Sequence, residues 1–285
     1  MNKKKKITVL LILLVAEILI GVGIWLTNTG GEKHETIKEA MRDAVLHEEN
    51  HVSLFGIAVN PSLIAGMIVT AVLLIFALIV RIFVIPRFKM VPGKFQLLLE
   101  EWVGFFEGLA KSNSPHRNRF LGAYIFAAGS YIFVGTLFEL FGFQAVTTEG
   151  YSISLPAPLA DINGALMMGC LSYLVILSGG LVQNKFRGLL LTLKEFSLPV
   201  SMSFRLFGAL LSGMLVTELI YFYLQLSFLL PVVVGVLFTL LHALIQAYVL
   251  TMLVSMFYGE VTEPPKKKKK KSKNQAEEQQ VAEAA

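Results

Sequence analysis

Long apolar runs alternate with short polar stretches along almost the whole chain, and they set the expected architecture. Each run has about 18 residues or more, the length that a helix needs to cross the hydrocarbon core of a bilayer. None of them has the alternating pattern of a membrane β-strand. The runs are residues 7–26, 62–84, 120–143, 161–181, 188–223 and 231–258. The pattern predicts an all-α, polytopic integral membrane protein with about five to six transmembrane helices.

The fifth run is unusual, because at roughly 35 residues it is longer than a perpendicular membrane span. We expect a helix that is strongly tilted, broken at Pro199, or both, since proline disrupts the interior of a helix. Only a short turn, ending at Pro231, separates this run from the sixth. The last two runs are therefore expected to form a long tilted hairpin.

The other segments complete the predicted organisation. Residues 1–26 begin with lysines and have the features of a signal-anchor or a signal peptide; the length of the apolar run and the absence of an A-x-A site favour an uncleaved anchor. Residues 27–60 are expected to be extracytoplasmic, residues 61–260 to form the membrane domain, and residues 261–285 to form a disordered lysine-rich cytoplasmic tail. Residues 95–111 mix acidic and large apolar side chains, which predicts an amphipathic helix at the membrane interface.

Composition and charge agree with this layout. The chain is 55% hydrophobic, and its net charge of +5 resides in loops and at the ends. With the N-terminal lysines inside, the basic segments 81–119 and 183–187 also lie inside, and segment 144–160, which has no Lys or Arg, lies outside. We therefore predict a multi-pass protein of a bacterial plasma membrane that contacts lipid and no nucleic acid. The single cysteine, Cys170, excludes an intrachain disulfide.

One charge stands apart, because Arg205 lies within an apolar run. An arginine at membrane depth is costly unless it faces water or a partner, and it cannot lose its charge. Its helical neighbours at i−4, i+3 and i+7 are Ser201, Gly208 and Ser212. Such a face lets another group approach closely, which favours a functional role over an arginine that merely extends to the lipid headgroups.

Further polar residues at or near membrane depth are candidates for an ion path. They are Asp161, Asn163, Glu195, Glu218, His242 and Gln246. The last run also carries a polar line at helical spacing: Gly235, Thr239, His242 and Gln246. Arg205 precedes the turn of the predicted hairpin by about 22 residues and Gln246 follows it by about 18, so the amide can lie at the depth of the guanidinium. Asp161 and Asn163 could simply cap the helix that follows, but a series of such groups leading inward favours a proton path.

One motif points elsewhere. Residues 47–51, HEENH, fit the zinc-protease pattern H-E-x-x-H. A catalytic zinc needs a third ligand and a cleft, which about 30 residues between two membrane spans do not supply. We interpret the segment as a solvated charged helix, and we expect no metal and no cofactor.

Four stretches carry a resemblance to a known family. LKEFSLPVSMSFRLFGALLSG resembles the arginine-bearing helix of the F-type ATP synthase subunit a (ATPase subunit 6 family), and FTLLHALIQAYVLTMLVSMFYGE resembles its final helix. LPAPLADINGALMMG is similar to the segment with that family's access-channel aspartate, and VPGKFQLLLEEWVGFF to its VPGK…E-W-V segment. The likeness covers about residues 60–260 in order.

The resemblance implies a stator subunit, not an enzyme by itself, whose two half-channels face a ring of c subunits. Ion flow past the membrane carboxylates of the ring would then drive rotation and ATP synthesis. It implies that Arg205 is the essential arginine and Gln246 its partner. By the same resemblance Asp161 and Asn163 line the outer half-channel, and Glu195 is the acidic position near the cytoplasmic start of the arginine helix.

The implied partners are the c-ring, the b subunits of the peripheral stalk, membrane lipid, and protons or Na⁺. The stripe around Arg205 would face the rotor; it comprises Ser201, Gly208 and Ser212. Some positions depart from the family's pattern. Met214 stands where an acidic residue or His is frequent, with Glu218 one turn later, and Thr239 stands where Glu or His is common, with His242 close by. Ala209 replaces the usual Asn. From these departures together, we expect a proton path through Glu218 and His242.

The alternative is a secondary transporter or ion channel in which Arg205 binds an anionic substrate. Such proteins are typically built from internal repeats with helices broken at mid-membrane. The sequence has no repeat, and Pro199 is the only breaker within a long run.

Overall fold

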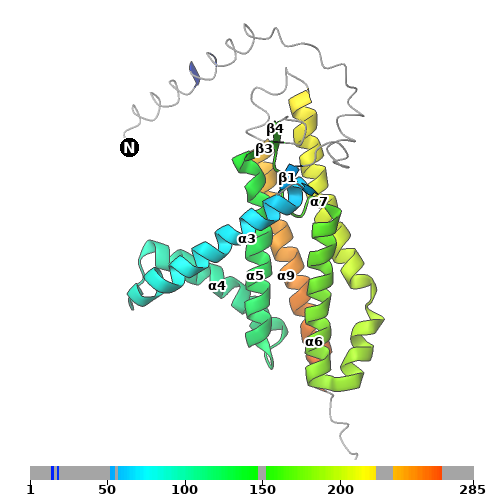
Figure 1. The fold of residues 1–285 in the computed structure, drawn as a ribbon. Helices are drawn as coiled ribbons and strands as arrows, with labels where there is room; N and C mark the ends of the chain where they lie inside the picture. The colour runs from blue at the N-terminus through cyan, green and yellow to red at the C-terminus, as the bar shows by residue number, and fades with distance from the viewer. Residues whose placement is uncertain are drawn as a thin grey trace, which may run out of the picture. The chain divides into compact units, whose positions relative to one another are not determined.

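Helices dominate the computed structural model, which describes residues 14–15, 18, 52–54, 57–146, 152–222 and 234–264 (Figure 1). Five helical stretches in this part of the chain are long and apolar enough to cross a membrane: Pro61–Arg87, Asn118–Phe141, Ile162–Lys194, Ser197–Thr217 and Val234–Thr262. The predicted all-α polytopic class is confirmed. The predicted first run, the segment 27–60 and the lysine-rich tail lie almost entirely outside the described residues.

The described elements are mostly helical, with two short β-hairpins between them. The helical elements are α3 (Pro61–Ile79), the π-helical η1 (Val80–Val84), η2 (Ile85–Arg87), α4 (Lys94–Asn113), α5 (Asn118–Phe138), η3 (Glu139–Phe141), α6 (Ile162–Lys194), α7 (Ser197–Phe222), the π-helical η4 (Val234–Thr239) and α9 (Leu240–Thr262). Two antiparallel hairpins pair β1 (Val52–Leu54) with β2 (Ile57–Val59) and β3 (Gln144–Val146) with β4 (Ser152–Ser154). The second hairpin lies in segment 144–160, between two of the predicted apolar runs.

The chain divides into two compact units. Unit 1 comprises Met1–Thr70, Val134–Asp161 and Phe207–Leu244, and unit 2 comprises Ala71–Phe133, Ile162–Leu206 and Ile245–Ala285. No lysine or arginine occurs among the described residues of unit 1. The described lysine and arginine side chains therefore all belong to unit 2, and the topology predicted from the positive-inside rule stays a prediction.

Within unit 2, helices approach closely where glycine removes side-chain bulk, a common device between membrane helices. Gly129 of α5 faces the ring of Phe106 on α4, and Gly179 of α6 faces the ring of Tyr258 on α9. Both rings belong to side chains that are only 1% exposed. A Cβ at either glycine would overlap the ring opposite, so these two contacts fix the packing of α4 on α5 and of α6 on α9.

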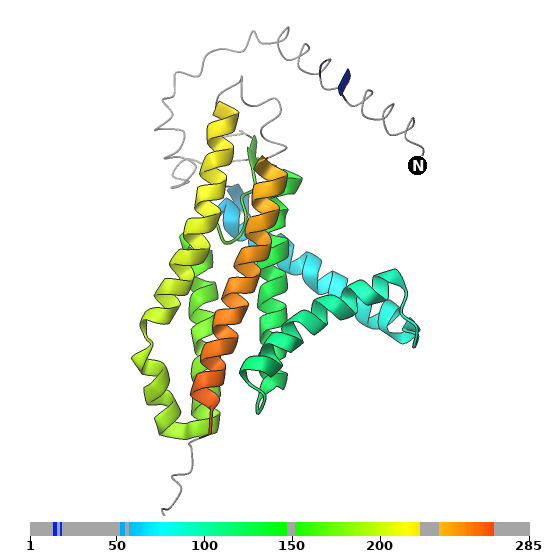
Figure 2. The same ribbon diagram turned by 180° about the vertical axis from the view of Figure 1, so that it is seen from behind.

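The helix α6 contains a sharp corner. Lys185 has φ 50° and ψ −131°, a conformation that side chains with a Cβ rarely adopt. Nearby, Gly188 lies so close to the backbone of Gly180 that a Cβ at Gly188 would collide with it. Figure 2 shows this corner in light green, where the chain turns before it leads into α7.

The predicted fifth run, residues 188–223, is shared between two helices in a way that the sequence did not predict. Its first residues, through Lys194, belong to α6, and the helix is interrupted at Glu195 and Phe196. Pro199 lies in the first turn of α7, where a backbone N–H has no partner within the helix, so proline is tolerated there. The prediction of a break was right, but its assignment to Pro199 was wrong.

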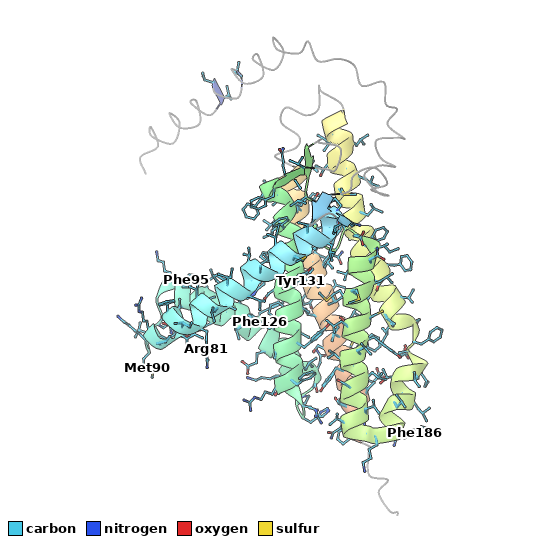
Figure 3. All side chains as sticks on the ribbon, in the orientation of Figure 1. Arg81, Met90, Phe95, Phe126, Tyr131 and Phe186 are labelled. Atoms are coloured by element: carbon cyan, nitrogen blue, oxygen red, sulfur yellow. The ribbon has the colours of Figure 1, made fainter. Side chains whose placement is uncertain are left out.

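The helix α4 forms as the amphipathic pattern predicts. Two of its aromatic side chains, Trp102 and Phe106, pack inward: Trp102 Nε1 donates to Ser130 Oγ over 3.0 Å, and the indole ring contacts Phe106 and Phe133. Figure 3 shows Arg81, Met90 and Phe95 together at the end where α3 leads into α4. The location of α4 at the membrane interface stays a prediction.

Candidate functional site

The helix α7 presents one face that the rest of the described chain leaves uncovered. Arg205 lies on it together with Ser201, Gly208 and Ser212, and all of them are exposed. Among the described residues, a Cβ placed on Gly208 would meet nothing within 4 Å. We call these four positions the open face of α7; they are the stripe that the helical spacing predicted.

The opposite side of α7 is packed. Its buried side chains are mainly large and apolar: Met202, Leu206, Leu210 and Met214. Near the start of the helix, Gly169 of α6 lets the backbone of α7 approach closely at Pro199 and Ser203. This packed side holds α7 in place and directs Arg205 away from the chain's own core.

Arg205 is not neutralised by its own chain. Among the residues that the structure describes, it forms no hydrogen bond and no ion pair. Gln246 of α9, predicted as its partner, is only 6% exposed, and its Oε1 is buried without a hydrogen-bond partner. The two residues belong to the same unit, but the structure shows no hydrogen bond between them in the described part of the chain. Their partnership stays a prediction.

His242 and Thr239 lie where η4 passes into α9. His242 is half-buried, with Nδ1 3.1 Å from the backbone oxygen of Phe238 and its ring centroid 4.1 Å from that of Phe238. Thr239 is buried at the end of the π-helical turn. The polar line predicted from α-helical spacing therefore begins in a wider turn than the pattern assumed. Glu218 lies in α7, and its side chain is outside what the structure describes.

Asp161 immediately precedes α6 and has a partner that the sequence did not reveal. Asn60 Nδ2 donates to Asp161 Oδ2 over 2.6 Å, within unit 1. Asn163 lies in the first turn of α6, exposed, and belongs to unit 2. Asn60 could have been found in the sequence as an Asn-Pro pair at a helix start, but nothing there links it to Asp161.

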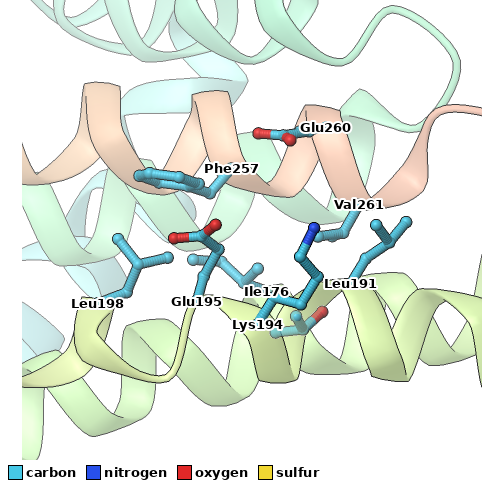
Figure 4. Close-up of a pocket in the computed structure, with 9 residues that line it drawn as sticks. Ile176, Leu191, Lys194, Glu195, Leu198, Phe257, Glu260 and Val261 are labelled. Atoms are coloured by element: carbon cyan, nitrogen blue, oxygen red, sulfur yellow. The ribbon is translucent and has the colours of Figure 1, made fainter.

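Glu195 lies in the interruption between α6 and α7, at the edge of a pocket in unit 2. Lys194 and Glu195 line this pocket from one side, and Glu260 of α9 lines it from the other (Figure 4). Its remaining wall is mostly apolar and comprises Ile176, Leu191, Thr192, Leu198, Phe257 and Val261. Two carboxylates and an ammonium group thus share one small space, and Glu260 is a member that the sequence reading missed.

The structure therefore gives three of the predicted site residues different surroundings. Arg205 is on the open face of α7, Asp161 is bound by Asn60, and Glu195 is beside Glu260. The described residues contain no group of three His, Cys, Asp or Glu side chains that could hold a metal ion, and the segment 47–51 lies outside them.

Comparison with known proteins identifies the family. The family model described as ATP synthase A chain matches residues 64–259, well over half of the chain. The ATP synthase subunit a of Cereibacter sphaeroides (strain ATCC 17025 / ATH 2.4.3) is 26% identical over 183 residues, which cover 60% of this chain and 70% of that protein. The ATP synthase subunit a of Histophilus somni (strain 129Pt) is 28% identical over 198 residues, which cover 59% and 73%. The chain therefore belongs to the ATP synthase A chain family, that of F-type ATP synthase subunit a.

Proposed function

We propose that this chain forms the stationary side of the ion path in ATP synthase, with two half-channels that face the c-ring and are separated by Arg205. As a member of the subunit a family it is a multi-pass membrane component of the complex, has a role in proton translocation, and is not catalytic by itself. The contact with the c-ring, the b subunits as neighbours and a bacterial plasma membrane as location belong to the proposal. The family match gives no support to the alternative of a secondary transporter.

One observation carries the proposal: Arg205 is exposed and unpaired, among the described residues, on the open face of a membrane-length helix. A permanent positive charge at membrane depth is costly without a partner. The chain's own described side chains supply none, so we expect the partner to come from another subunit. A carboxylate is the best candidate, because a guanidinium group binds it through charge-assisted hydrogen bonds.

The proposed mechanism follows from the electrostatics of such a pair. A carboxyl group in a low-dielectric environment favours its neutral form, and a nearby cation favours the ionised form. Each c-ring carboxyl would therefore release its ion opposite Arg205 and take up another only at a half-channel. The fixed charge would also oppose direct passage of cations between the half-channels. Each ion that crosses yields about 2.3 kcal/mol per 100 mV, so several are needed for each ATP.

The other predicted residues fit two access paths. Asp161, Glu218 and His242 belong to unit 1, whose described residues include no lysine or arginine, and we assign them with Asn163 to the outer half-channel. Glu195 belongs to unit 2, and we assign it to the inner half-channel. Gln246 would orient the guanidinium group of Arg205.

The outer path can be tested at its two atypical members. We expect Glu218→Gln and His242→Ala each to lower proton-driven ATP synthesis about tenfold or more, because each removes a group that can pass on a proton. The measurement is ATP synthesis in inverted membrane vesicles, with Leu241→Ala, an exposed neighbour on α9, as the control. Unchanged synthesis in both variants would show that the path does not run through these residues.

The contact with the rotor can be tested by disulfide formation. In a Cys170→Ser background, we expect Gly208→Cys to form a disulfide with a cysteine introduced near the membrane carboxylate of the c subunit, because a Cβ at Gly208 would meet no other helix within 4 Å in the described part of the chain. Leu210→Cys is the matched control, since Leu210 is 3% exposed on the packed side. Cross-linking from Leu210 but not from Gly208 would contradict the proposal.

A further inference from the structure

A hydrogen bond at the start of α3 links two segments that are 101 positions apart in the sequence: Asn60 Nδ2 donates to Asp161 Oδ2 over 2.6 Å. We propose that Asn60 is a positioning residue of the outer half-channel, which orients the carboxylate of Asp161 for proton uptake, and that the hydroxyl of Ser62 lies along the same path. The inference rests on the proposed function, because it deepens the role assigned there to Asp161.

The start of α3 fixes which side of the Asn60 amide faces Asp161. Asn60 caps the helix: its Oδ1 accepts the backbone N–H of Ser62 over 2.9 Å, and its backbone oxygen accepts the N–H of Leu63 over 3.0 Å. Pro61 follows as the first helical residue, a position that suits proline. Because the amide oxygen is bound to the helix, the NH₂ group points to the carboxylate, and a flipped amide would lose both side-chain bonds.

The hydroxyl of Ser62 is a second, independent observation. Ser62 is 3% exposed, and its Oγ has no hydrogen-bond partner in the described part of the chain. Leaving a buried hydroxyl unpaired is unfavourable. A hydroxyl can both donate and accept, which a group that passes a proton through water must do. Ser62 follows Asn60 by two residues at the start of α3, and we include its hydroxyl in the same path as part of the proposal.

The charges of unit 1 are consistent with this role. Besides Asp161, its described titratable side chains are those of Glu139 and His242, and Glu218 belongs to its part of α7. Asn60 donates to Asp161 through a neutral amide, which stabilises a carboxylate without supplying a proton of its own. Asn60 can therefore hold Asp161 in place while Asp161 itself binds and releases protons.

Two substitutions separate the contact from the helix cap. Serine is also a good N-cap residue, so Asn60→Ser keeps the cap but is too short to reach Asp161. Asn60→Asp keeps the cap and brings a second carboxylate to Asp161. Both changes disfavour the ionised carboxylate. We therefore expect the dependence of ATP synthesis on the pH of the outer side to shift to higher pH, by about one unit for Asn60→Ser and further for Asn60→Asp.

The experiment uses the purified complex in proteoliposomes at a fixed membrane potential, with the pH of the two sides varied separately. A shift on the outer side alone supports the inference. A profile that stays in place, with or without a uniform loss of rate, overturns it, because a purely structural role does not move the profile. If Asn60→Asp fails to assemble, the Asn60→Ser profile decides alone.

The exchange variant Asn60→Asp/Asp161→Asn adds a stringent check. It restores an amide–carboxylate pair with the roles reversed, so the profile should return toward that of the parent, and a profile no nearer to the parent than that of Asn60→Asp would count against the inference. Arg205→Ala in the same assay distinguishes a failure of the proposed function from a failure of the role assigned to Asn60. Coupled synthesis in Arg205→Ala would overturn the proposed function, whereas an inactive Arg205→Ala with an unshifted Asn60→Asp profile would overturn only the role of Asn60.

Discussion

Replacing Arg205 with alanine is expected to abolish coupling: proton-driven ATP synthesis and ATP-driven pumping should both fall to about one hundredth of the parent rate or less. Without the cation, an arriving carboxyl group has nothing that favours its ionised form in a low-dielectric setting. The complex should still assemble, because Arg205 is exposed and makes no described contact that holds α7 in place. The measurement is ATP-driven acidification of inverted vesicles, together with quantitation of the assembled complex.

Two further variants sharpen this result. Arg205→Lys keeps a positive charge but loses the planar fork of donors and the constant protonation of arginine, so we expect severe loss here too. Val200→Ala, an exposed position on the same helix, is the control and should pump normally. Normal pumping in Arg205→Ala would refute the assignment. Loss of the assembled complex in Arg205→Ala but not in Val200→Ala would assign Arg205 a structural role instead.

The membrane helices could be predicted because their signal is local. Residues 62–84 and 120–143 are continuous apolar runs, and the structure has membrane-length helices at both places. The break before α7 could not be placed in the same way. Proline signals a break only in a helix interior, and Pro199 lies in the first turn of α7 because the helix is already interrupted at Glu195 and Phe196. The corner at Lys185, within α6, could not be predicted either. That corner depends on the close approach of Gly180 and Gly188, which no local pattern reveals.

In the candidate site, too, features of a single helix could be predicted and contacts between distant segments could not. Arg205 and the spacing of Ser201, Gly208 and Ser212 are properties of one helix, so the open face of α7 could be predicted from the sequence alone. Partners that other segments contribute could not be predicted from the sequence. Asn60 meets Asp161 only through tertiary structure, and Glu260 gains a possible role only because α9 brings it to the pocket beside Glu195.

Replacing Gln246 with methionine is expected to stabilise the fold while it impairs coupling. Methionine has nearly the length of glutamine but no polar oxygen, and Gln246 Oε1 is buried without a partner in the described part of the chain. Removing that unpaired acceptor should raise the free energy of unfolding by about 1 kcal/mol. The buried, unpaired oxygen of Gln246 would then lower stability but be retained for function, as is common for polar groups at functional sites.

Coupling should change in the opposite direction, with ATP-driven pumping about tenfold lower, because Arg205 would lose the amide expected to orient it. The pair of measurements is denaturant unfolding of the purified chain in detergent and pumping in vesicles. Gln246→Glu is the matched contrast: it keeps the shape of the side chain but buries a charge, and it should lower stability. A less stable Gln246→Met would mean that the amide has a partner in the folded chain, and full pumping by Gln246→Met would mean that Arg205 is oriented without it.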